Sequence, residues 1–127
     1  IVTKKDIDVI QQAKAAIGAG ITVLLNKVNM EPGELRHIFI GGAFGYCLNV
    51  ISAQDIGFLP QINPKQVKLC GNTALTGCEQ LLLSTKNLEN LKKIRKQIKM
   101  INLAQYENFD ELFFQNLYLE PLRLHES

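Results

Sequence analysis

A short apolar run, a glycine turn and a helix follow one another twice in the middle of the chain. The first run, residues 36–40, stops at Gly41-Gly42, and the second, residues 67–70, stops at Gly71-Asn72. A repeated order of strand, turn and helix is typical of α/β folds, in which parallel strands carry these turns at one edge of the sheet. The repeat therefore predicts an α/β domain with a short, mostly parallel sheet flanked by helices.

A long amphipathic helix is predicted before the first strand. Thr3 and Asp6 have the spacing of a capping box, and apolar residues then recur every three, four or seven positions as far as Asn29. A glycine inside a helix costs about 1 kcal/mol relative to alanine. Gly18 and Gly20 therefore indicate that another backbone or a ligand comes close to this helix.

Further helices are predicted after each glycine turn. Residues 50–57 show helical spacing after the first turn, and residues 73–83 show it after the second, with Thr73 as the N-cap. Residues 100–103 are interpreted as a short edge strand. The segment 109–118 is aromatic and too apolar to remain free in solvent, so we expect it to pack back as a helix.

Residues 86–99 predict a helix with apolar residues on one face and cations elsewhere. Leu88, Leu91 and Ile94 recur at helical spacing. We interpret the cations as the solvated face of this helix, because no aromatic residues alternate with them as in many nucleic-acid interfaces. The cations are Lys86, Lys92, Lys93, Arg95, Lys96 and Lys99.

Composition is that of one globular domain, residues 1–127. Its 46% hydrophobic residues exclude a disordered chain, and its formal net charge of +2 gives no electrostatic reason to bind nucleic acid or a membrane. No apolar stretch approaches the roughly 20 residues that cross a bilayer. Cys47, Cys70 and Cys78 lack CxxC spacing, so we expect buried thiols, no disulfide framework and a cytoplasmic protein.

The segment that follows the first strand is the most informative for function. It reads Gly41, Gly42, Ala43, Phe44 and Gly45. Glycine has no Cβ, so a ligand can approach the backbone, and the start of the next helix offers amides to a phosphate or a polar ring edge. A tight turn with positive φ explains the same glycines without any ligand. Gly71-Asn72 leaves the same two interpretations open.

Gln11 and Lys14 are three residues apart and project from nearly one face of the first helix. They reach a nucleotide if that face lines a cleft, and they are ordinary surface residues if it does not. No Ser-His-Asp arrangement and no HExxH motif is present. Asp6 is interpreted as a cap residue and the pair Asp110 and Glu111 as a helix start. We therefore assign no catalytic residue and no metal ligand.

At these same positions the sequence resembles the C-terminal domain of the reductive activators of corrinoid proteins. The similarity lies in residues 6–21, which include Gln11 and Lys14, in residues 40–60 and in residues 71–84. This family belongs to the superfamily of sugar kinases, chaperones and actin-like ATPases. The resemblance implies half of an actin-like, RNase H-like ATPase fold. It also implies that residues 41–45 are the adenosine motif and that Gly71-Asn72 lie on the neighbouring strand end.

The resemblance also implies the activity. Members use ATP to return inactive Co(II) corrinoid proteins of methyltransferase and O-demethylase systems in anaerobes to Co(I). Their iron–sulfur cluster lies in an N-terminal domain, and upstream acidic-glycine loops hold the phosphates and Mg²⁺. We therefore expect a C-terminal fragment that clasps ATP, has the corrinoid protein and the remaining domains of the activator as partners, and is inactive by itself.

A docking module is the alternative function. In that hypothesis the domain holds the corrinoid protein or the rest of the activator through the apolar segment 109–118, since aromatic strips are common at interfaces. Gly41-Gly42 would then be only a turn.

Overall fold

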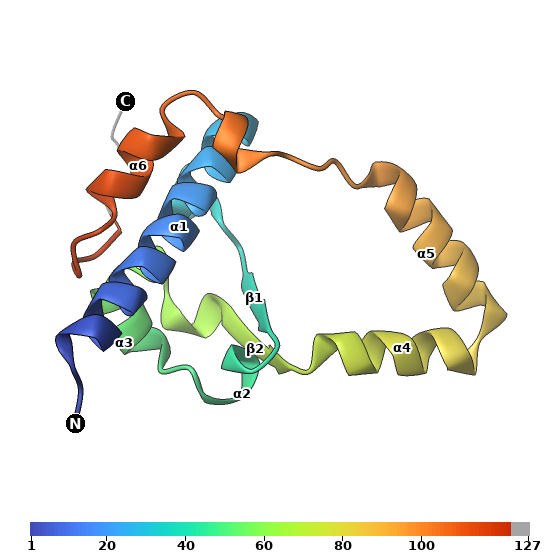
Figure 1. The fold of residues 1–127 in the computed structure, drawn as a ribbon. Coiled ribbons are helices and arrows are strands. Elements are labelled where there is room, and N and C mark those ends of the chain that lie inside the picture. The colour runs from blue at the N-terminus through green and yellow to red at the C-terminus, as the bar shows by residue number, and fades with distance from the viewer. Residues whose placement is uncertain (123–127) are drawn as a thin grey trace. The chain divides into compact units, whose positions relative to one another are not determined.

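The computed structural model describes residues 1–122, so the last five residues of the expected domain lie outside the described part. The chain divides into two compact units (Figure 1). Unit 1 consists of residues 1–38, residues 49–67 and the described residues from 102 onward. Unit 2 consists of residues 39–48 and 68–101.

Unit 1 is built on the long helix α1, Lys4–Val28. The capping box is present, because the Thr3 hydroxyl accepts a hydrogen bond from the Asp6 amide at 3.3 Å and the Asp6 carboxylate accepts one from the Thr3 amide at 2.8 Å. The helix ends at Asn29, which adopts the left-handed conformation with φ of 50°. The predicted helix and both of its ends are confirmed.

Shorter elements complete unit 1. They are α3, Val50–Asp55, and α6, Phe109–Gln115, with the 3-10 turns η1, Pro32–Glu34, η2, Pro64–Gln66, and η3, Leu103–Gln105. Helix α6 packs along α1 (Figure 1), which confirms that the aromatic segment packs back as a helix. Ala15, Ala19 and Val23 of α1 are fully buried and form the centre of the core.

Unit 2 contains the sheet, which consists of β1, Ile38–Gly41, and β2, Val67–Gly71. Only the first residue of each strand, Ile38 or Val67, is assigned to unit 1. The two strands are paired and parallel. Three helices follow them: α2, Phe44–Cys47, α4, Thr73–Leu83, and α5, Thr85–Gln97. The α/β prediction with a short parallel sheet is confirmed.

Three local predictions are wrong. The N-cap of α4 is Asn72, not Thr73, because the Asn72 side chain accepts from the Leu75 amide. Residues 100–103 form no strand: the Asn102 side chain accepts from the Ala104 amide and starts η3 there instead. The three cysteines are exposed rather than buried. In the part of the chain that the structure describes, no helix is both long and apolar enough to cross a membrane.

Candidate functional site

The two glycine turns meet at the carboxyl ends of the strands. The Gly42 amide donates a hydrogen bond to the Gly71 carbonyl at 2.7 Å. Gly42 has φ of +79°, a backbone conformation that favours glycine, and the space where its Cβ would lie has no atom within 4 Å. Unit 2 thus brings together the residues that the sequence singled out at both turns, around an open position above Gly42.

Close backbone packing explains another glycine of the first turn. A Cβ on Gly45 would lie 2.5 Å from the Gly71 amide nitrogen and 2.6 Å from the Ile40 carbonyl oxygen, closer than van der Waals contact allows. Gly45 therefore lets α2 lie against the end of β2. The glycines have different roles: Gly45 packs, whereas Gly42 turns the chain and leaves space.

Tyr46 is a residue of this site that sequence reasoning missed. Its hydroxyl oxygen accepts a hydrogen bond from the Asn72 amide at 3.0 Å, and the Asn72 side chain accepts from the Leu75 amide at 3.0 Å. Tyr46 thus ties α2 to the second turn, while Asn72 starts α4. The local sequence around Tyr46 holds no signal for this contact, because its partner is 26 residues away.

Gln11 and Lys14 lie in unit 1, where both bind the backbone of the C-terminal segment. The Lys14 Nζ atom donates to the carbonyl oxygens of Asn116 at 2.9 Å and Tyr118 at 2.7 Å, and the Gln11 Nε2 atom donates to that of Leu117 at 3.0 Å. Lys14 is only 1% exposed, so it is not an ordinary surface residue. Burial lowers the pKa of its ammonium group, and the Glu120 carboxylate opposes this shift.

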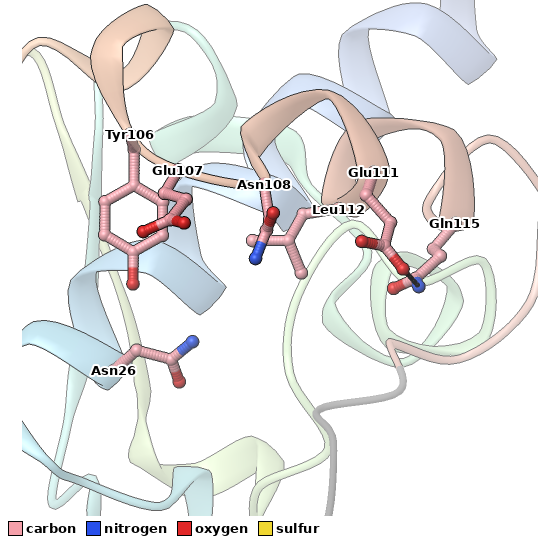
Figure 2. Close-up of a pocket in the computed structure, with 7 residues that line it drawn as sticks. All are labelled: Asn26, Tyr106, Glu107, Asn108, Glu111, Leu112 and Gln115. Carbon is pink, nitrogen blue, oxygen red and sulfur yellow. Dashed lines mark hydrogen bonds between the residues drawn. The ribbon is translucent and has the colours of Figure 1, made fainter.

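A polar cavity of about 440 Å³ lies in unit 1, between the end of α1 and residues 106–115 (Figure 2). Glu111 lines it and accepts a hydrogen bond from Gln115 at 3.2 Å, so this helix-start acid does face a cavity. Two carboxylates in the wall repel phosphate, which makes the cavity a poor nucleotide site. Its lining residues are Asn26, Tyr106, Glu107, Asn108, Glu111, Leu112 and Gln115.

The short parallel sheet with glycine turns fits the half of an actin-like module that the sequence predicts, and the comparison with protein families shows the family itself. Residues 1–126 match the family described as the C-terminal domain of RACo, the ASKHA domain, where ASKHA denotes the sugar kinase, chaperone and actin-like ATPase superfamily. The chain belongs to this family, which confirms the resemblance drawn from its sequence.

Curated relatives carry names from corrinoid chemistry. The chain is 37% identical over 116 residues to the corrinoid activation enzyme RamQ of Eubacterium limosum. The aligned residues make up 91% of this chain and 20% of that protein. It is 27% identical over 118 residues to the Co(II) methylated amine-specific corrinoid protein reductase of Methanosarcina barkeri, covering 91% of this chain and 22% of that protein. The chain thus spans about a fifth of the length of these relatives.

Proposed function

We propose that this chain is the nucleotide-clasping part of an ATP-dependent activator that returns corrinoid proteins from Co(II) to Co(I). Membership in the ASKHA family and the names of its two relatives support the assignment. The observation that carries it is the open position above Gly42, at a turn whose amide is already bonded to Gly71. No atom lies within 4 Å of the Cβ position of Gly42, so a ligand can come close to the backbone at this turn.

The proposed contacts with nucleotide lie at the two turns of unit 2. They are Gly41, Gly42, Ala43, Phe44, Gly45, Gly71 and Asn72. Gln11 and Lys14 stay a prediction as nucleotide contacts. Because both side chains already bind backbone carbonyls, a nucleotide would recruit Lys14 only at the loss of two hydrogen bonds, one of them buried.

The reaction needs more than these turns. In this proposal ATP supplies the free energy of an uphill one-electron reduction, an iron–sulfur domain of the activator delivers the electron, and the corrinoid protein receives it. The phosphates and Mg²⁺ are held by other parts of the activator. Among residues 1–122 no three His, Cys, Asp or Glu side chains are grouped as metal ligands would be. Because this proposal places the phosphate and metal contacts in other parts of the activator, we expect the chain to bind ATP without hydrolysing it.

A Gly42→Val variant tests the site. Valine at φ of +79° is strained, and its side chain would fill the open position, so we expect ATP affinity to fall by about tenfold or more. Gly33→Val is the matched control, because nothing lies within 4 Å of a Cβ at Gly33 and its φ is not positive. ATP affinity is measured by calorimetry, with circular dichroism to verify folding.

Equal ATP affinity of the folded Gly42→Val and Gly33→Val variants would contradict the proposed site. If Gly42→Val does not fold, Gly42→Ala replaces it, since its methyl group has free space there and is less strained at a positive φ than a β-branched side chain. If the pure chain hydrolysed ATP in a metal-dependent way and the Gly42→Val substitution abolished that activity, this would contradict the proposal that other parts of the activator hold the phosphates.

A docking module remains the second candidate, and one observation favours it. Phe114 and Tyr118 are 64% and 69% exposed, although the segment that carries them packs on α1. Exposed aromatic side chains are enriched at interfaces. In this alternative they contact the corrinoid protein or the rest of the activator, and the chain binds no ATP.

A further inference from the structure

Tyr46 of α2 combines an exposed ring with a hydrogen bond that holds the ring in place. The side chain is 71% exposed. Its hydroxyl oxygen accepts a hydrogen bond from the Asn72 amide at 3.0 Å, which joins α2 to the second glycine turn. Exposed side chains usually exchange between rotamers within nanoseconds. The bond to Asn72 therefore orders this ring before a ligand arrives.

Gly71 provides the space in which the ring lies. A Cβ on Gly71 would be 2.9 Å from the Cε1 atom of Tyr46 and 3.1 Å from its hydroxyl oxygen, so a larger residue would push the ring away. Gly71 also has φ of +61°, a conformation that favours glycine. On this side of the second turn, a ligand thus meets an aromatic ring rather than bare backbone.

The two turns offer different surfaces to one ligand. The Cβ position of Gly42 is open, whereas that of Gly71 is covered by the ring of Tyr46. The Gly42 amide donates to the Gly71 carbonyl at 2.7 Å, so the glycine at the open position and the glycine beneath the ring are bonded to each other. An open backbone beside an ordered ring suits a flat ligand group, because aromatic rings attract one another by stacking.

We propose that the ring of Tyr46 contacts the nucleobase of the nucleotide that binds at the two turns, by stacking of the base on the ring. This inference rests on the proposed function and adds to its site a residue that recognises the base. The hydroxyl group, bonded to the Asn72 amide, holds the ring in position. A contact that is ordered in advance costs less conformational entropy when the ligand binds.

Two substitutions separate stacking from the hydrogen bond. Tyr46→Phe keeps the ring and removes the hydroxyl group, whereas Tyr46→Leu removes both. We expect ATP affinity to fall by about tenfold in Tyr46→Leu, because the base loses its stacking partner, and by less than about threefold in Tyr46→Phe. Calorimetry measures the affinities, and circular dichroism verifies that both variants fold.

Tyr46→Trp gives a direct readout of the contact, because the chain contains no other tryptophan. The indole ring keeps a stacking surface, and a base that stacks on it quenches its fluorescence. We expect ATP and adenosine to quench the emission and tripolyphosphate, which has no base, to leave it unchanged. Val9→Trp is the matched control, because Val9 is 58% exposed in unit 1, and its emission should not respond to any of the three.

The possible negative results have different meanings. Unchanged ATP affinity in Tyr46→Leu, with reduced affinity in Gly42→Val, would keep the nucleotide site and overturn the stacking contact. Equal weakening in Tyr46→Phe and Tyr46→Leu would leave Tyr46 only its hydrogen bond to Asn72. Quenching by tripolyphosphate as strong as that by ATP would show that phosphate, not the base, lies at the ring. If neither the unchanged chain nor Tyr46→Trp binds ATP at millimolar concentration, the proposed function and the stacking contact are both wrong.

Discussion

Lys14 shows how one side chain fixes a distant segment. Three successive carbonyl groups, those of Asn116, Leu117 and Tyr118, accept hydrogen bonds from Lys14 and Gln11. A buried ammonium group is tolerated only when hydrogen bonds replace its hydration. The three-residue spacing of Gln11 and Lys14 predicted a common face. The carbonyls that this face binds were not predictable, because they lie more than 100 residues further along the chain.

Replacement of Lys14 by methionine is expected to destabilise the fold. Methionine fills a similar volume but donates no hydrogen bond, so the carbonyls of Asn116 and Tyr118 lose their partner, at a net cost of about 1–3 kcal/mol. Urea unfolding followed by circular dichroism measures the loss. Lys5→Met, an exposed position of the same helix, is the control and should change stability by less than about 0.5 kcal/mol. Equal midpoints for the two variants would contradict this role.

The pH dependence of stability provides an independent test of Lys14. Because burial lowers its pKa in the folded chain below the ordinary value of 10.5, its charged form is less favourable folded than unfolded. The free energy of unfolding should therefore rise as pH increases from the folded pKa towards 10.5. This rise should be present in the unchanged chain and missing from Lys14→Met. Parallel curves for the two chains would show that the pKa is not lowered.

At the scale of elements, local sequence signals were sufficient to predict where a helix or strand begins or ends wherever neighbouring residues fix that position. Thr3 and Asp6 predicted the start of α1, and the glycines after residues 40 and 70 predicted the ends of both strands. Residues 100–103 had the composition of an edge strand, but a strand forms only with a partner. The sheet of the described residues contains only β1 and β2, and the Asn102 side chain starts the turn η3 at this place instead.

Asn72 is expected to act first as the cap of α4. Asn72→Ala removes the acceptor of the Leu75 amide, which typically costs about 1 kcal/mol, so exchange of that amide should accelerate about fivefold if it opens locally. Asn72→Asp keeps an acceptor and should leave exchange slow, but its charge should weaken ATP binding if the phosphates lie near this turn. Hydrogen exchange by NMR and calorimetry separate the two roles. Unchanged exchange in Asn72→Ala would contradict the cap.

At the scale of the whole molecule, the two units differ in character. The core residues Ala15, Ala19 and Val23 lie in unit 1, whereas unit 2 carries the glycine turns and two helices without a buried residue. The family was predictable because its three segments are ordered along the chain, and the match over residues 1–126 confirms it. The exposure of α4 and α5 was not predictable, because apolar spacing shows which residues share a face and not what covers that face.

The central claim is that ATP binds at the two glycine turns of unit 2. Amide chemical-shift mapping of the isotope-labelled chain with ATP and ADP tests it most directly, because the method detects affinities as weak as millimolar. We predict shifts centred on residues 41–45, Gly71 and Asn72, and a shift at Lys14 would add that residue to the site. No localised shift at saturating ATP, or shifts confined to the cavity around Glu107 and Glu111, would contradict the claim.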